Sequence, residues 1–303
     1  MFYFNILIHN FMFFYSSLIN SKNIIYHKNN IKCLSNKINI IDHILLKWRN
    51  ISISKFKIKN KNLEKIIPLD NFLKNKKIIS ISPSGYKGIY CTGICTFIKK
   101  NYNLDNYIFS GASSGSWNAL LMCYKNDVNI FKNKILLNSL NNTESIIDFE
   151  LMMKKKLLEN FNNNDFELNR LFIGVTTING FIPSATIYSN FKTLEDAIDC
   201  CIASSHIPLI TGGIINKYNN IYSFDGGFCK YPYLNSTKSV LHISPNIWEI
   251  TKYNDKSITN LYTDSQIFDT NLFSKHKYNF NELYENGYND TLKNKKILDL
   301  LLI

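Results

Sequence analysis

Short apolar runs alternate with longer apolar stretches of helical length through the middle of the chain. Runs of strand length, rich in Ile, Val, Phe and Tyr, occur at residues 78–82, 107–110, 171–177, 184–189 and 239–244. The stretches 88–100 and 114–125 are apolar on nearly every side and are long enough for several helical turns. The pattern predicts strands at the short runs and buried helices at the two longer stretches.

The clearest helical signal lies at residues 193–205. Thr193 is a favoured N-cap residue, and Glu195 and Asp196 complement the helix dipole in the first turn. A final helix is predicted over 280–303. Because strands alternate with helices, we expect an α/β fold with a mainly parallel sheet that is covered on both faces. Within residues 193–205, apolar residues recur at the i, i+3, i+4, i+7 and i+8 positions, as expected for one face of a helix. They are Leu194, Ala197, Ile198, Cys201 and Ile202.

Composition and charge divide the chain into two parts. Of its 303 residues, 45% are hydrophobic and 14% aromatic, which indicates a folded protein. The net charge of +12 is concentrated at the start, because residues 1–77 carry fourteen Lys and Arg against three acidic residues, a net charge of +11. We therefore predict a basic, partly apolar leader over 1–76 and a folded domain over 77–303.

The leader has several interpretations. Its opening apolar stretch, residues 1–19, is interrupted by Asn5, His9 and Asn10, so it is borderline for a membrane-spanning helix. No basic residue precedes this stretch as in a signal peptide, the first being Lys22. An interfacial or spanning anchor beside anionic headgroups is one interpretation, and a targeting segment or an unstructured leader is another. We expect a membrane-associated, intracellular protein.

The seven cysteines give little sign of a disulfide framework or a zinc site. Their number is odd, their spacing is irregular, and neither a CxxC pair nor a neighbouring histidine cluster is present. We expect the protein to occupy a reducing compartment, in which its cysteines stay as thiols. Cys91 and Cys95 lie four residues apart in an apolar stretch, so we expect them to be small buried residues.

The first candidate for chemistry is the sequence GASSG at 111–115. It matches the pattern G-x-S-x-G and lies between a predicted strand and a predicted helix. In a nucleophile elbow the serine occupies a sharp, strained turn, and the flanking glycines let the helix pass close to the strand. Ser113 would then be the nucleophile, with Gly111 and Gly115 forming the elbow. The alternative is an ordinary turn.

The loop PSGYKG at 83–88 is a candidate anion site. It follows a predicted buried strand and leads into a helix, so its backbone N–H groups can point at an anion with the support of the helix dipole. The spacing of a nucleotide-binding P-loop is absent from it. The alternative is an ordinary loop that uses Pro and Gly to connect a strand to a helix.

A candidate base occurs in the sequence FDGG at 224–227. Asp225 ends a short apolar run, and Gly226 and Gly227 leave room for it to approach another loop. A carboxylate with the ordinary pKa of about 3.9 is a weak base at neutral pH, and burial would raise that pKa. The sequence D-G-G is also typical of a turn.

Taken in order, PSGYKG, GASSG, ASSHIP and DGG resemble the patatin-like phospholipase family. YENGYNDTL, near the C-terminus, resembles a further helix of that family, and the resemblance covers roughly residues 77–245. It implies a three-layer α/β/α fold and a lipid acyl hydrolase with a Ser113–Asp225 dyad, which requires neither a metal ion nor an organic cofactor. It also implies an oxyanion hole formed by backbone N–H groups, and the matching positions are Ser84, Gly85, Tyr86, Lys87 and Gly88.

This loop departs from the family pattern. Where the family has three glycines, the chain has Pro83, Ser84 and Gly85, and Pro83 has no N–H to donate. Ser84 must adopt a conformation that an L-residue tolerates, or the oxyanion hole is damaged. The expected partners are a lipid substrate and a membrane surface, with no nucleic acid, and the sequence does not indicate the oligomeric state.

Two alternatives to the dyad enzyme stay open. The altered loop and the basic leader fit a catalytically silent lipid-binding or membrane-tethered protein. A Ser-Asp-His esterase would instead use His242 or His276 with the same serine and aspartate. A structural role is favoured for His242 because it lies within a predicted strand, and His276 lies in a polar segment. His206 occupies a position that varies in the family.

Overall fold

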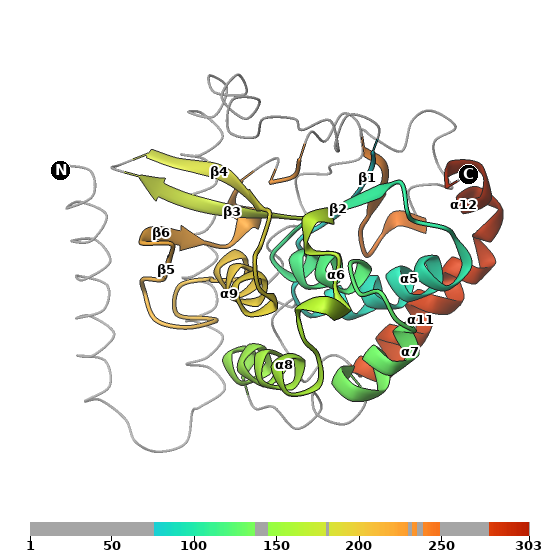
Figure 1. Cartoon of the computed structure of the whole chain (residues 1–303), viewed down its shortest axis with the longest axis horizontal. Helices are drawn as coiled ribbons and strands as arrows, with labels where there is room; N and C mark the ends of the chain where they lie inside the picture. Colours follow the sequence, from blue (N-terminus) through green and yellow to red (C-terminus); the bar gives the residue numbers. More distant parts are fainter. Residues whose placement is uncertain are drawn as a thin grey trace, which may run out of the picture.

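The computed structural model describes residues 76–136, 145–179, 182–229, 232–234, 239–248 and 279–302, which form a mixed α/β fold around a seven-stranded sheet (Figure 1). The predicted leader, apart from Lys76, and His276 lie outside these residues. Within the described ranges, no helix combines the length and the apolar character needed to cross a membrane.

The centre of the sheet is parallel, as predicted. Its strand order is β5-β6-β3-β2-β1-β7, and β4 also pairs with β3. β7, β1, β2 and β3 are mutually parallel, whereas β3 pairs antiparallel with β4 and β6, and β6 pairs antiparallel with β5. The strands are β1 (Lys77–Ile81), β2 (Tyr107–Ala112), β3 (Leu171–Asn179), β4 (Ile182–Ser189), β5 (Lys217–Tyr218), β6 (Ile221–Phe224) and β7 (Ser239–Ile243).

The predicted helices are found, with changes at their ends. Thr193 caps α9, because its hydroxyl accepts a 3.1 Å hydrogen bond from the Asp196 N–H. The single helix predicted at the C-terminus is interrupted at Asn294 and forms two helices. The helices are α5 (Gly88–Asn101), α6 (Ser114–Met122), α7 (Val128–Phe131), α8 (Ile146–Asn160), α9 (Leu194–Ser204), α11 (Phe280–Lys293) and α12 (Lys295–Leu301).

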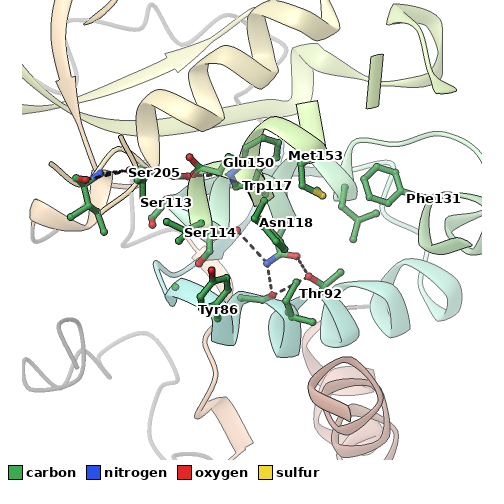
Figure 2. A pocket seen from close by; sticks show the side chains of 18 residues that line it. Tyr86, Thr92, Ser113, Ser114, Trp117, Asn118, Phe131, Glu150, Met153 and Ser205 are labelled. Atoms are coloured by element: carbon green, nitrogen blue, oxygen red, sulfur yellow. Dashed lines mark hydrogen bonds between the residues drawn. The ribbon is translucent and has the colours of Figure 1, made fainter. Parts of the chain in front are cut away.

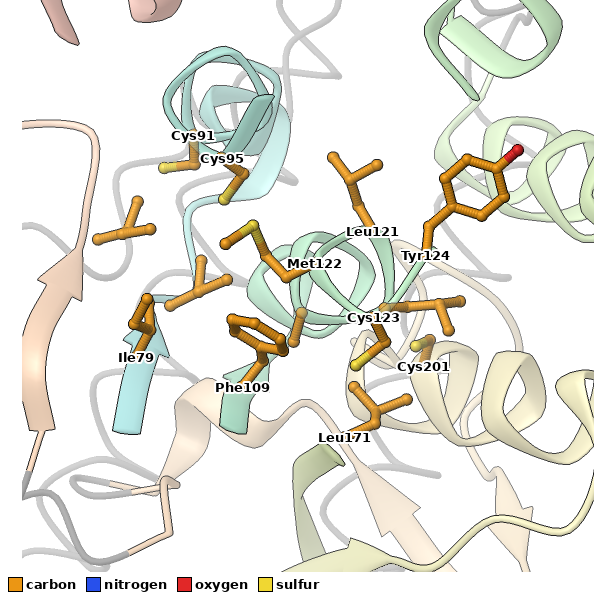
Figure 3. Packing of buried hydrophobic residues seen from close by; sticks show 14 of the residues in the cluster. Ile79, Cys91, Cys95, Phe109, Leu121, Met122, Cys123, Tyr124, Leu171 and Cys201 are labelled. Atoms are coloured by element: carbon orange, nitrogen blue, oxygen red, sulfur yellow. The ribbon is translucent and has the colours of Figure 1, made fainter. Parts of the chain in front are cut away.

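The main hydrophobic core surrounds α6, which packs on β1, β2 and β3 (Figure 3). Cys91 and Cys95 of α5 face it from one side and Cys201 of α9 from another, and all three thiols are fully buried. Their burial confirms the expectation for Cys91 and Cys95. The strands contribute Ile79, Phe109 and Leu171 to the same core.

The other face of the sheet carries a smaller apolar cluster. Ile78, Ile108, Phe172 and Ile187 form it, and Leu234 packs against them. The described helices with extensive contacts to the sheet, α6 and α9, lie on the opposite face, where the main core is (Figure 1). Helical covering of the second face stays a prediction.

Candidate active site

Two strands meet end to end on one edge of β3. Ala112 at the end of β2 pairs with Gly174, and Phe224 at the end of β6 pairs with Thr176. Both pairs lie on the same edge of β3, because β4 occupies the other edge from Phe172 to Asn179. β2 runs parallel to β3 and β6 runs antiparallel, so their C-terminal ends point toward each other. The residues that follow these ends are Ser113 and Asp225, which the register therefore brings together.

Ser113 lies at a strained turn between β2 and α6, as the motif predicts. Its φ of 53° and ψ of −131° belong to a region that L-residues rarely adopt, at a typical cost of about 1–3 kcal/mol. A Cβ on Gly111 would lie 2.1 Å from the Gly115 carbonyl oxygen, and one on Gly115 would lie 2.2 Å from that of Ile81. Both positions therefore require glycine for the helix to start so close to the strands.

The last residue of α9, Ser204, and the segment that follows it hold both candidate residues in place. Ser204 Oγ accepts a 2.8 Å hydrogen bond from the Ser113 N–H and donates one of 2.7 Å to the Gly174 carbonyl oxygen. The His206 carbonyl oxygen accepts a 2.7 Å hydrogen bond from the Asp225 N–H. Because one segment binds the backbone of Ser113 and of Asp225, their relative position is fixed by packed, buried groups.

The Asp225 carboxylate is buried beside Ser113. Only 3% of the residue is exposed, and Oδ1 accepts a 2.7 Å hydrogen bond from the Gly227 N–H. Oδ2 has no hydrogen-bond partner among the described residues, and the Ser113 hydroxyl interacts with the carboxylate. Burial raises the pKa of Asp225 to about 7, although hydrogen bonding from Ser113 and Gly227 opposes the rise. A Cβ on Gly226 would lie 2.2 Å from the Gly174 carbonyl oxygen, so glycine is required there as well.

The loop after β1 adopts a conformation that tolerates Ser84. Ser84 has a φ of −154°, and the positive φ of 49° falls on Gly85, where glycine accommodates it. The Ser84 N–H donates a 2.9 Å hydrogen bond to Ser114 Oγ. The Gly88 N–H bonds to carbonyl oxygens of its own turn, and Lys87 closes that 3-10 turn.

Two backbone N–H groups in this loop have no acceptor within the described part of the chain. They are the N–H groups of Gly85 and Tyr86, which lie at the start of the turn leading into α5. Gly85, Tyr86 and Gly88 line the same pocket as Ser113, whereas Ser84 and Lys87 do not. Of the five expected donors, Gly85 and Tyr86 are therefore the best placed.

A pocket of about 720 Å³, part of it open to solvent, extends from Ser113 (Figure 2). Ser113, Ser205 and Glu150 lie at one end in this view, and Met153 and Phe131 lie at the other. The apolar part of the wall includes Ile89, Leu121, Phe131, Ile146, Phe149 and Met153.

No described histidine is bonded to the Asp225 carboxylate, whose neighbours among the described residues are the Gly227 N–H and the Ser113 hydroxyl. His242 lies on β7, and its Nδ1 is 2.8 Å from Ser80 Oγ. Burial lowers the pKa of His242 to about 4, so it is neutral at pH 7. These contacts agree with a structural role for His242 in the sheet.

The pattern analysis missed Ser204, Ser205 and Glu150. The two serines lie in the segment ASSHIP, which was recognised as a motif although its contacts could not be inferred. Glu150 lies on α8, a helix that was not predicted, where a capping box joins Ser145 and Asp148. The spacing S-x-x-D before an apolar run was the available signal.

Searches with protein-family models and against curated proteins find no match to this chain. Its function is therefore inferred from the geometry of the site and from the motifs that resemble the patatin-like family. The decisive geometric feature is the meeting of Ser113 and Asp225 at two opposed strand ends.

Proposed function

We propose that the chain is a patatin-like serine acyl hydrolase that cleaves fatty-acyl esters of phospholipids or related lipids. The observation that carries the proposal is the pairing of Ser113, at a strained elbow, with a buried aspartate whose pKa of about 7 suits a base at neutral pH. The apolar wall of the adjoining pocket supports an acyl chain as the ligand.

The first half-reaction forms an acyl-enzyme. Asp225 takes the proton from Ser113 Oγ, which attacks the ester carbonyl carbon, and the carbonyl electron pair moves onto the oxygen. The N–H groups of Gly85 and Tyr86 stabilise this oxyanion, and the N–H of Ser114, the residue after the nucleophile, is the donor expected in an elbow of this type. As the intermediate collapses, Asp225 returns the proton to the departing alcohol oxygen.

The second half-reaction releases the fatty acid. Asp225, again a carboxylate, takes a proton from a water molecule that attacks the acyl carbon. Collapse of the second tetrahedral intermediate breaks the bond to Ser113 Oγ, which regains its proton from Asp225. Since one aspartate carries every proton, the cycle as written uses neither a metal ion nor an organic cofactor.

The proposal includes the three-layer α/β/α arrangement and a membrane surface as partner. The parallel strands β7, β1, β2 and β3, with α6 and α9 on one face, support the first. The charge of the leader supports the second, as do exposed apolar side chains on one face of α8. These are Ile147, Leu151 and Leu158.

A catalytically silent lipid-binding protein is the competing function, favoured by one observation. Ser84 replaces a glycine, and its N–H is already bonded to Ser114 Oγ, so this donor is occupied. If the free N–H groups of Gly85 and Tyr86 do not suffice for an oxyanion, the pocket would hold a lipid without cleaving it.

The two functions separate in an ester hydrolysis assay. We expect the full chain to hydrolyse long-chain acyl esters and phospholipids in mixed micelles, and expect the Ser113→Ala and Asp225→Asn variants to lose this activity. Asp105→Asn changes an exposed aspartate away from the pocket and serves as the matched control. Lipid binding by wild type without any hydrolysis would contradict the enzyme and favour the silent protein.

A further inference from the structure

Glu150 is an acidic residue in the wall of the pocket, at the end where Ser113 and Ser205 lie. It lies on α8, is 5% exposed, and lines the pocket that Ser113 also lines. The proposed dyad mechanism makes no use of it. A carboxyl group in such a place is costly unless its oxygens find hydrogen-bond partners, so those partners indicate what it can do.

Ser205 is the polar neighbour of Glu150 in this wall. Ser205 Oγ donates to the Cys201 carbonyl oxygen at 2.9 Å and accepts a 3.1 Å hydrogen bond from Trp117 Nε1. The Ser205 hydroxyl also interacts with the Glu150 carboxyl group, and this interaction lowers the pKa of Glu150. Because Ser205 has one hydroxyl hydrogen to share between the Cys201 carbonyl oxygen and Glu150, the Glu150 carboxyl group keeps acceptor capacity for a further donor.

Burial and a nearby negative charge disfavour the ionised form of Glu150. Burial raises the pKa of Glu150 well above its usual range, and the charge of Asp225 raises it further. The other titratable groups coupled to it are the phenol of Tyr86 and the thiol of Cys201, both neutral at pH 7 because burial raises their pKa. No cation is among these neighbours to hold Glu150 as a carboxylate.

The Glu150 carboxyl group therefore offers an acceptor oxygen to the pocket that it lines. Figure 2 shows Glu150 beside Ser205 and Trp117, at the end of the pocket where Ser113 lies and away from Phe131. A substrate group that meets this acceptor therefore lies close to the ester under attack. A methylene group would leave the acceptor without a partner, whereas a hydroxyl would donate to it.

We propose that Glu150 is a specificity-determining residue that selects esters carrying a hydroxyl group near the ester bond, on either the acyl chain or the alcohol. This inference rests on the proposed acyl hydrolase function and names its substrate class. The hydroxyl donates to the Glu150 carbonyl oxygen, and the remaining acyl chain occupies the apolar wall toward Met153 and Phe131. One additional neutral hydrogen bond predicts a preference of about tenfold in kcat/KM.

Two matched pairs of esters test the proposal and separate the two sources of the hydroxyl. In one pair the alcohol is constant and the acyl chain has or lacks a 3-hydroxyl group. In the other the acyl chain is constant, and the alcohol is glycerol or a propanol without the adjacent hydroxyl. The measured quantity is the ratio of kcat/KM within each pair, which does not depend on the fraction of folded enzyme.

We expect wild type to prefer the hydroxylated ester of at least one pair by about tenfold. Glu150→Met removes the acceptor and should bring that ratio to about one. Glu150→Gln keeps a carbonyl oxygen for the substrate and an amide N–H for Ser205, so it should retain the preference. Glu159→Gln, an exposed position on the same helix, is the control and should match wild type.

Equal rates for both members of both pairs in wild type would overturn the role of Glu150 and leave the hydrolase function intact. A preference that persists in Glu150→Met would also overturn it. If wild type hydrolyses none of the four esters, the proposed function fails and this inference fails with it.

Discussion

The buried Asp225 carboxylate should set the acidic limb of the pH profile. The residue must be ionised to accept the proton of Ser113, and burial raises its pKa to about 7. For a single ionisation at this pKa, the active fraction falls to about a tenth at pH 6 and to about a hundredth at pH 5. An exposed aspartate of ordinary pKa, about 3.9, would give no such loss in this range.

The assay is kcat/KM for a soluble acyl ester between pH 5 and pH 9, because this parameter reports ionisations of the free enzyme. Repeating it with a moderate amount of organic cosolvent distinguishes a carboxyl from an imidazole. A lower dielectric disfavours the charged form of either group, so the limb should move to higher pH for Asp225 and to lower pH for a histidine.

Two results would refute this reasoning. An acidic limb near pH 4 would mean that Asp225 is not desolvated as its 3% exposure implies, or that it is not the base. A limb near pH 7 that moves to lower pH in cosolvent would identify a histidine as the base and revive the triad.

The other predictions concern stability. Gly111→Ala should destabilise the fold by about 3 kcal/mol in denaturant unfolding, because its Cβ would lie 2.1 Å from a carbonyl oxygen. Gly213→Ala is the control: it has open space around it and should stay within about 1 kcal/mol of wild type. Equal stability of the two variants would contradict the packing of the elbow. Ser113→Gly should be inactive yet about 1 kcal/mol more stable than Ser113→Ala, since glycine relieves the strained φ, and the absence of any gain would argue against strain. His242 has a pKa of about 4 in the folded state, below its ordinary 6.5. Its contribution to the free energy of unfolding, about 3 kcal/mol, should be complete above pH 6.5 and be lost as the pH falls to about 4. The unfolding free energy of His242→Gln should lack this pH dependence.

Local patterns predicted most of the elements that form the site. The strand before Ser113 and the helix after it follow from apolar runs and two glycines, which act over a few residues of chain. The capped start of α9 at Thr193 is a local signal of the same kind. The interruption at Asn294 escaped prediction because apolar residues continue on both sides of it.

Strand direction and long-range contacts could not be predicted in this way. The antiparallel pairing of β4 and β6 with β3 depends on tertiary packing, since an apolar run has the same pattern in either direction. The approach of Asp225 to Ser113 depends on that pairing, so the motif resemblance implied the dyad but the sequence pattern alone did not. Glu150 was missed because it is one of three acidic residues of an unpredicted helix, and no local pattern distinguishes it from Asp148 and Glu159.

The central claim is that Ser113 is an activated nucleophile, and covalent labelling tests it most directly. The full chain is treated with a fluorophosphonate probe, and the modified peptide is located by mass spectrometry. We expect one label on Ser113, no label in Ser113→Ala, and strongly reduced labelling in Asp225→Asn. Folded wild type that takes up no label, or a label that persists in Ser113→Ala, would contradict the account.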